Sequence, residues 1–270
     1  MSEQRVTVSI DAGVARVALA RPKKKNALDL AMFEALAGAA AQLAGEKDLR
    51  AVVLHGEGSA FCAGLDITNF MADPATIGAL LEKTPGDAVN LAQRVAWAWR
   101  ELPVPVIAAL HGEVFGGGLQ VALGADIRIV DPEAGLSVME IRWGIIPDMG
   151  GSRFLKELVG YDVAMELALT GRIVPGEEAV RIGLATRCVA DPLADAMTLA
   201  STIAERSPDA VRAIKCLLHR AARLGDPEGL DLETRLQMSL LGGKNQMEAA
   251  RAGLEGRTPA FVAASIRLPK

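Results

Sequence analysis

Apolar and polar residues alternate at the start of the chain, where VTVSI and VARVALA flank the turn residues DAG. Alternation on both sides of a short turn predicts a β-hairpin. The spacing then changes, because Leu28, Met32, Phe33, Leu36 and Leu43 recur as they do on one face of a helix. Three apolar runs come later, and each predicts a buried strand: RAVVLHG, VPVIAALHG and ADIRIVD.

Helical patterns fill much of the remaining chain. They predict helices over 87–102, in PGEEAVRIGLA, and over 192–206, 208–224 and 231–254. The stretch EGSAFCAGLDITNF is rich in small residues and is predicted to be a loop. Strands that alternate with helices indicate an α/β fold in which crossover helices wrap a sheet. Because the last quarter has no strand pattern, we expect a core over 1–206 and a C-terminal helical segment over 207–270.

Composition narrows the classes of function. The chain has 270 residues, of which 50% are hydrophobic, so we expect a folded protein with a large core. Its formal net charge of -4 and its 4% of aromatic residues argue against nucleic-acid binding. Cys62, Cys188 and Cys216 are few and unevenly spaced, which indicates reduced thiols without a zinc cluster. With no signal-peptide or membrane-spanning pattern, we expect a cytoplasmic protein that binds no membrane.

Three consecutive glycines, Gly116 to Gly118, stand between the apolar run VIAAL and the helical pattern LQVALGA. The first N–H groups of a helix lack partners within that helix, and glycine lets a ligand atom approach the backbone closely. An oxygen that becomes anionic during a reaction would be stabilised there. Close packing of helix on strand is an equally valid interpretation of the triplet alone. The spacing matches neither a dinucleotide-binding loop nor a Walker loop.

A second loop, AFCAGLDI, also places small residues directly after a strand. With ARPKKKNAL, HGEVFGGGLQVALGADIRI, LSVMEIRWGIIPDMGG, LTGRIVPGEEAVRIGLATRCV and EGRTPAF, it resembles the enoyl-CoA hydratase/isomerase (crotonase) superfamily along nearly the whole chain. The resemblance implies an α/β fold, a crotonase-like spiral of repeated ββα units with a C-terminal helical trimerisation segment. It also implies a homotrimer or a dimer of trimers. The substrate would be an acyl-CoA thioester, with no other cofactor and no metal.

The resemblance assigns roles to residues of both loops. The N–H groups of Leu65 and Gly117 would form an oxyanion hole for the thioester carbonyl. Lys24 and Lys25 would help hold the CoA phosphates, although a solvated turn also accounts for these lysines. Phe261 and Lys270 lie in the tail that can contact CoA in a neighbouring subunit. Other positions would line the path of the CoA group: Cys62, Ala63, Asp66 and Ile67.

Proton transfer depends on three further positions. Hydratases of this family hold a water between two carboxylates, and the matching positions here are Gln120 and Glu140. Gln120 can contact the substrate or orient a water, but a neutral amide cannot accept the proton. Asp148 lies eight residues after Glu140. Dienoyl-CoA isomerases of the family carry acids that match Glu140 and Asp148, and a third acid where Gln120 stands. The alternative for Asp148 is a helix cap.

The sequence therefore favours an enzyme that shifts a double bond of an enoyl- or dienoyl-CoA, with Glu140 and Asp148 as the catalytic acids. Three alternatives stay open. The first is an enoyl-CoA hydratase that uses Glu140 alone, and the second is an acyl-CoA thioester hydrolase. The third is an acyl-CoA-binding subunit without catalytic activity. Trp97 and Trp99 are candidates for positions near the acyl pocket.

Overall fold

A six-stranded sheet forms the centre of the protein in a computed structural model, which describes residues 4–72 and 75–269. The strand order is β1-β2-β3-β4-β6-β9, in which β1 and β2 are antiparallel and all other neighbours are parallel. The predicted hairpin and the three buried strands are therefore confirmed. The strands are β1 (Val6–Asp11), β2 (Val14–Leu19), β3 (Ala51–Gly56), β4 (Val106–Leu110), β6 (Ile127–Val130) and β9 (Arg187–Cys188).

A second sheet of three short strands was not predicted. It has the order β5-β7-β8, formed by β5 (Glu113–Phe115), β7 (Gly135–Ser137) and β8 (Val174–Pro175). Each strand has only two or three residues. Segments this short contain too few residues for an alternating pattern to be recognised, because strands usually have about five or six. The small sheet matters for function, because the glycine triplet follows β5 directly.

Helices cover both faces of the large sheet. In the first half of the chain they are α1 (Leu30–Ala44), α2 (Ile67–Ala72), α3 (Ala75–Leu81), α4 (Leu91–Glu101) and α5 (Gly117–Leu123). The second half adds α6 (Gly151–Val159), α7 (Tyr161–Thr170), α8 (Gly176–Arg181), α9 (Pro192–Ala204), α10 (Pro208–Ala221), α11 (Asp226–Leu240) and α12 (Lys244–Glu255). Two 3-10 helices are η1 (Pro22–Lys24) and η2 (Met139–Trp143). Within 4–72 and 75–269, no helix combines the length and apolarity needed to cross a membrane.

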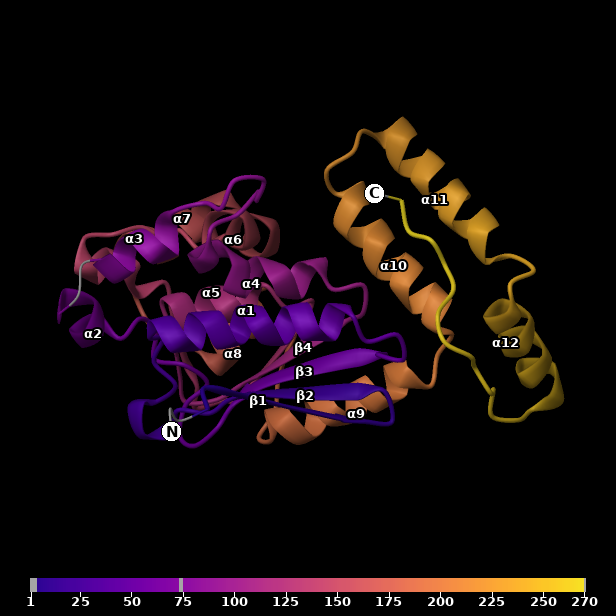
Figure 1. Ribbon diagram of the computed structural model, residues 1–270, viewed down its shortest axis with the longest axis horizontal. Helices are drawn as coiled ribbons and strands as arrows, with labels where there is room; N and C mark the ends of the chain where they lie inside the picture. Colours follow the sequence, from indigo (N-terminus) through magenta and orange to yellow (C-terminus); the bar gives the residue numbers. More distant parts are fainter. Residues whose placement is uncertain (1–3, 73–74, 270) are drawn as a thin grey trace.

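The two faces of the sheet bury alternate residues of each strand. On β3, Val52 and Leu54 join the larger core cluster, which also contains apolar residues of α1 and α4. Ala51 and Val53 point to the opposite face and join a smaller cluster with α9. The period of two follows from strand geometry, and burial on both faces explains why the residues AVVL of this strand are all apolar. Figure 1 shows α1 crossing one face and α9 lying on the other.

Several predicted bounds differ from the structure, by a few residues at α8, α9 and α10 and more clearly at three other places. The helix predicted over 87–102 begins only at Leu91, because the Asn90 side chain accepts the N–H of Gln93 and forms a capping box. The helix predicted over 231–254 is two helices, since α11 and α12 are separated at Gly242, whose φ is 74°. The stretch EGSAFCAGLDITNF ends in α2 and is a loop only up to that helix.

Helices α10 to α12 project from the rest of the protein, with the extended C-terminal stretch running beside them (Figure 1). They have a small apolar cluster of their own, centred on Ala213, Leu232 and Leu236. The extended stretch is tied down by Asp209, whose Oδ1 accepts the N–H groups of Ser265 and Ile266 at 2.6 and 2.8 Å. The boundary predicted between 206 and 207 falls in the connection between α9 and α10. Lys270 lies outside the described residues.

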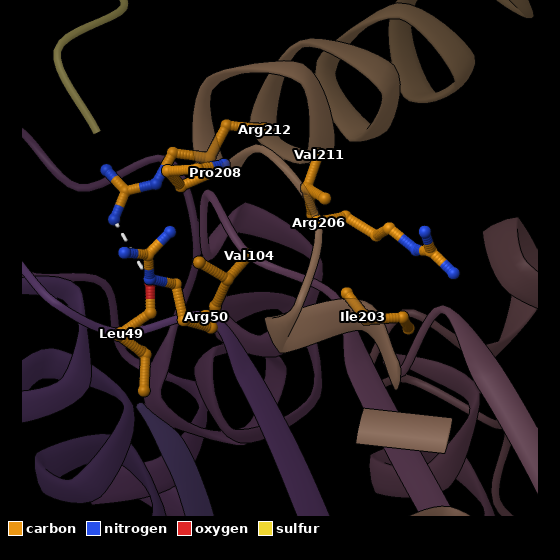
Figure 2. A pocket seen from close by; sticks show the side chains of 8 residues that line it. All are labelled: Leu49, Arg50, Val104, Ile203, Arg206, Pro208, Val211 and Arg212. Atoms are coloured by element: carbon orange, nitrogen blue, oxygen red, sulfur yellow. Dashed lines mark hydrogen bonds between the residues drawn. The ribbon is translucent and has the colours of Figure 1, made fainter. Parts of the chain in front are cut away.

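Polar contacts dock α10 onto the body of the protein. The buried Lys215 Nζ contacts Asp126 Oδ2 at 2.8 Å and donates to the carbonyl oxygens of Trp99 and Val104. His219 Nε2 contacts the other oxygen of Asp126 at 2.8 Å. Figure 2 shows a second contact nearer the start of the helix, where the Arg212 guanidinium donates to the backbone oxygen of Leu49. These contacts set the direction in which α10 leaves the sheet.

We expect Lys215→Met to destabilise the protein by about 3 kcal/mol or more, because it leaves the carboxylate of Asp126 without its charged partner. The side chain of Lys215 is only 6% exposed and that of Asp126 is 16% exposed, so water can do little to solvate the carboxylate that has lost its partner. Urea unfolding measures the change. The control is Lys156→Met, which removes an exposed lysine of α6. Equal unfolding free energies for the two variants would contradict this account of the docking.

Candidate active site

A cavity of about 650 Å³ lies between α1, α2, α3, α5 and the segment that follows β7. Its walls are mostly apolar, with Phe33, Phe70 and Leu80 on one side and Trp143 and Ile146 on another. Among the described residues that line it, only three carry an amide or carboxyl side chain: Gln120, Glu140 and Asp148. The three side chains that the sequence singled out for proton transfer are thus gathered in one apolar cavity.

Leu65 contributes a backbone N–H group to the cavity wall. Its two neighbours bond to Leu28, since Leu28 N–H donates to Gly64 O at 2.8 Å and Asp66 N–H donates to Leu28 O at 2.9 Å. In such a bridge the N–H of the central residue points the opposite way. Leu65 lines the cavity, and its N–H has no protein acceptor in the described part of the chain. It is therefore available to a ligand.

Gly117 contributes the second N–H group, at the first residue of α5. Gly116 precedes it with a φ of 51° and donates its own N–H to Ser137 O at 2.9 Å. That bond to the small sheet fixes the start of the helix. The N–H of Gly117 likewise lacks a protein acceptor among the described residues. The two loops are in contact, because a Cβ placed on Gly64 would lie 3.7 Å from the Gly117 nitrogen.

Close packing also requires the glycine triplet. A Cβ on Gly117 would lie 2.9 Å from Leu28 Cδ1 and 3.0 Å from Met149 Sδ. One on Gly118 would lie 2.5 Å from Cys62 O. Close packing, one of the two interpretations that the sequence left open, is therefore confirmed for these glycines. Stabilisation of an anionic oxygen by the Gly117 N–H stays a prediction.

Gln120 on α5 is held in one orientation. Its Oε1 accepts the N–H groups of Met149 and Gly151, at 2.8 and 3.0 Å, which places its Nε2 on the opposite side. That Nε2 donates to Glu140 Oε1 at 2.6 Å. Two backbone donors at one oxygen settle which end of the amide is which. Gln120 thus joins the loop before α6 to the carboxylate of Glu140.

Glu140 presents its second oxygen to an apolar environment. The residue is 6% exposed, and Oε2 is buried without a hydrogen-bond partner among the described residues. Burial raises the pKa of Glu140 above its usual value, and the nearby charge of Asp148 raises it further, while the hydrogen bond from Gln120 opposes the rise. A buried carboxylate oxygen without a partner can accept a proton from a bound molecule.

Asp148 lines the same cavity from the loop before α6. Burial raises the pKa of its carboxyl group. The alternative role as a helix cap is wrong, because α6 begins after Gly150 and has no side-chain hydrogen bond at its cap. The carboxyl group is therefore not used to stabilise the helix start. It is available at the cavity wall.

The other predicted site residues divide into two groups. Ala63 and Ile67 line the cavity beside Leu65. Cys62 is fully buried, burial raises the pKa of its thiol to about 12, and its Sγ–H donates to Asn26 O. Asp66 is buried against Arg21, with which it forms an ion pair. Neither Cys62 nor Asp66 lines the cavity, and their contact with CoA stays a prediction.

The lysine turn lies beside the AFCAGLDI loop, which carries Leu65. The N–H of Ala63 donates to Lys25 O at 2.9 Å, which places the turn at the edge of the cavity. Lys24 is exposed, and Lys25 Nζ forms an ion pair with Glu113. Lys24 is thus freer than Lys25 to meet a phosphate. Binding of CoA phosphates by either lysine stays a prediction.

Sequence reasoning missed most of the apolar wall. Phe70, Ile77, Leu80 and Leu81 come from α2 and α3, two short helices that were not predicted. The apolar spacing of Ile77, Leu80 and Leu81 was the available signal. The tryptophans were placed wrongly, because they lie outside this lining. Trp99 is buried in the core, and Trp97 stacks on Phe154.

Comparison with known proteins agrees with this geometry. The family model described as enoyl-CoA hydratase/isomerase matches residues 9–263. The "Probable enoyl-CoA hydratase echA8" of Mycobacterium bovis is 34% identical over 97% of this chain and 99% of its own length. The peroxisomal Delta(3,5)-Delta(2,4)-dienoyl-CoA isomerase of Arabidopsis thaliana is 30% identical over 93% of both chains.

Solved structures show the same fold. The enoyl-CoA hydratase of Bacillus anthracis superimposes with a TM-score of 0.88 and 31% identity, over 96% of this chain and 99% of that one. The enoyl-CoA hydratase of Mycobacterium smegmatis gives a TM-score of 0.84 and 29% identity, over 96% and 99%. The chain belongs to the enoyl-CoA hydratase/isomerase family, and it has the crotonase fold. It is an enzyme of that family, whose members process acyl-CoA thioesters.

The raised pKa of Glu140 has a consequence for stability. A native pKa above the unfolded value means that the native state binds this proton more tightly, so the protein loses stability as the pH rises through the native pKa. We expect Glu140→Gln to remove this loss. Urea unfolding at about pH 4 and about pH 8 should show the variant gaining free energy of unfolding over the unmodified protein only at the higher pH. The exposed Glu133→Gln is the control, and an equal effect of both substitutions would contradict the prediction.

Proposed function

We propose that the enzyme shifts a double bond of an enoyl- or dienoyl-CoA through an enolate. In this proposal the N–H groups of Leu65 and Gly117 bind the thioester oxygen. Both residues line the cavity, their N–H groups have no protein acceptor in the described part of the chain, and they belong to loops in direct contact. Donors that are fixed before the substrate arrives stabilise the developing negative charge without having to reorganise.

The state of Gln120 is the observation that carries the proposal. A water held for hydration needs two acceptors that point at it, one of which takes its proton. The side-chain oxygen of Gln120, Oε1, already accepts the N–H groups of Met149 and Gly151. Its donor is directed at Glu140. Gln120 therefore orients Glu140 and leaves no paired carboxylate for a water, whereas Asp148 supplies a second acid elsewhere in the cavity.

The two carboxyl groups divide the proton transfer in this mechanism. A Cβ on Gly116 would lie 3.5 Å from Glu140 Oε1 and 3.9 Å from Oε2, so this carboxylate is close to the start of α5, where the thioester oxygen would bind. Its Oε2, which has no hydrogen-bond partner among the described residues, takes the proton from the α-carbon. The C–H electron pair forms the enolate, and the former double bond moves along the chain. Protonated Asp148 then gives its proton to the distal carbon. Glu140 ends protonated and Asp148 ionised, and one proton exchange through solvent restores the starting state.

The apolar walls indicate the kind of acyl chain that this site accepts. Beyond Glu140 and Asp148, the described lining consists of side chains such as Phe33, Leu80 and Trp143. A hydroxyl or carboxyl group on the distal chain would lose its water there without gaining a partner. The proposed substrate is therefore an unsubstituted hydrocarbon chain, long enough to fill the cavity.

We expect Asp148→Asn to abolish double-bond isomerisation, lowering kcat by about a hundredfold or more, because the amide keeps the shape of the carboxyl group but cannot return the proton. The assay follows 3-enoyl-CoA and 3,5-dienoyl-CoA thioesters, and products are identified by mass and retention time. Gln120→Glu is the companion variant, which should leave isomerisation equal or slower because a third carboxylate raises the pKa of Glu140.

The names of most relatives favour hydration as the second candidate function. The same assay distinguishes the two functions. Strong hydration of 2-enoyl-CoA by the unmodified protein, unaffected by Asp148→Asn, would show that Glu140 alone is sufficient and would refute the isomerase proposal. Hydration that arises only in Gln120→Glu would support it, because that variant completes a two-carboxylate site for water.

Chain length should control kcat/KM. Each methylene that the cavity buries contributes about 0.8 kcal/mol, or about fourfold, so kcat/KM should rise along a series of straight-chain substrates until the cavity is full. Ile77→Trp should remove the gain for long chains and spare short ones, because Ile77 lines the cavity. Met71→Trp is the control, since Met71 is 79% exposed and outside the lining. A flat series, or equal effects of both variants, would refute the assignment.

A further inference from the structure

The segment over 21–29 contacts the loop over 57–66, which carries Leu65, at several points. The Asn26 side chain donates to the carbonyl oxygens of Glu57 and Ala60, at 2.9 and 2.8 Å. Leu28 bonds to the residues on both sides of Leu65. The backbone needed for these contacts is unusual, because Lys25 and Asn26 have φ values of 48° and 56°. The segment thus acts as a support for the loop that carries the Leu65 N–H.

An ion pair fastens this support directly beside Leu65. Arg21 Nη1 contacts Asp66 Oδ2 at 2.7 Å and also donates to Ala27 O at 3.0 Å. The side chains are only 10% and 7% exposed. Arg21 also lies 3.5 Å from Asp29, the residue that caps α1. The Arg21 guanidinium therefore connects three points: the loop at Asp66, the supporting segment at Ala27, and the start of α1.

The backbone of Asp66 is constrained as firmly as its side chain. Its N–H donates to Leu28 O, and its carbonyl oxygen accepts the N–H of Asn69 at the start of α2. A shift of the Asp66 carboxylate and backbone would move the Leu65–Asp66 peptide and, through the Cα of Leu65, would turn the Gly64–Leu65 peptide, which carries the Leu65 N–H. Hydrogen bonds weaken steeply when the donor is turned away from its acceptor. A small displacement of Asp66 therefore changes the direction of the Leu65 N–H at the cavity wall.

We propose that Arg21 and Asp66 are positioning residues that hold the Leu65 N–H in line with the substrate carbonyl. The inference rests on the proposed binding of a thioester oxygen by Leu65 and Gly117. It replaces the expected contact of Asp66 with CoA by an indirect role. Arg21 and Asp66 act through the backbone and touch no reacting atom, so their substitution affects the polarisation of the carbonyl more than the binding of the thioester.

Two variants separate positioning from simple stability. Asp66→Asn removes the charge of one partner and leaves Arg21 buried beside an amide. The double variant Arg21→Met/Asp66→Leu removes both charges, and replacing a whole buried pair by apolar residues usually restores stability. Lys215→Met is the control, because it breaks a different buried ion pair away from the cavity. Unfolding in urea and circular dichroism establish that each variant is folded.

The decisive measurement is the infrared carbonyl stretch of a bound saturated acyl-CoA that is isotopically labelled at its thioester carbon. This probe does not react, so the result does not depend on which reaction the enzyme performs. We expect the unmodified protein and Lys215→Met to lower the stretching frequency equally. Asp66→Asn and the double variant should lose most of this shift, while the Kd of the probe changes by less than about threefold. In both variants kcat on the preferred thioester should fall about tenfold or more, with little change in KM.

A full shift in the folded double variant would overturn the inference, because the ion pair would then contribute stability alone. Absence of a shift in the unmodified protein would also overturn it, since no carbonyl would be polarised for Asp66 to support. Failure of the proposed isomerisation is a separate result. It would be seen in the products formed from 3-enoyl-CoA, with the infrared shift intact.

Discussion

The contact between Gln120 and Glu140 is the interaction on which the site depends. A carboxylate in an apolar cavity is costly unless a neighbour stabilises it, and Gln120 supplies one charge-assisted hydrogen bond at 2.6 Å. Gln120 can do this only because its amide oxygen is held by the N–H groups of Met149, in the loop before α6, and of Gly151, the first residue of α6. That loop also carries Asp148. One amide side chain thus fixes the direction of Glu140 and the position of the loop that brings the second acid.

The small sheet determines where these groups lie. Strand β5 leads into the glycine triplet, and its partner β7 ends just before the 3-10 helix that carries Glu140. The N–H of Gly116 bonds to Ser137 on β7, so the start of α5 and the approach to Glu140 are joined by a backbone hydrogen bond. The large sheet provides the core, and the small one sets the distance between the donor N–H of Gly117 and the carboxylate.

The long apolar elements could be predicted from sequence, because burial on one or both faces imposes a period that persists over many residues. This is why β3 and α1 were found. The small sheet and the helix α2 have too few residues for a period, and tertiary contacts form them, whereas α3 has apolar residues at helical spacing that the sequence reasoning did not use. The site residues Glu140, Asp148 and Gln120 were named from motifs alone. Their hydrogen bonds were not, since the donors to Gln120 are backbone groups far along the chain.

Asp66 illustrates the limit of position-based reasoning. Its contact with CoA stays a prediction, but its place beside Leu65 does not bring its side chain to the cavity wall, because sequence proximity does not say which side of a loop a side chain occupies. In a bridged segment, neighbouring residues face opposite directions. Leu65 and Ile67 line the cavity, while Asp66 between them turns inward to Arg21. The alternation over these three residues was the signal that could have separated them.

The two N–H groups at the cavity wall that lack protein acceptors among the described residues belong to the main chain, and this has an evolutionary consequence. A substitution changes a side chain and leaves the peptide group in place, apart from proline, so mutation seldom removes either donor. The carboxyl groups have no such protection, since single replacements can create or remove them. A lineage with this scaffold can therefore exchange its acids and bases repeatedly while it keeps the capacity to stabilise an anionic oxygen. A new reaction in such a lineage therefore begins in a site that already stabilises an anionic oxygen.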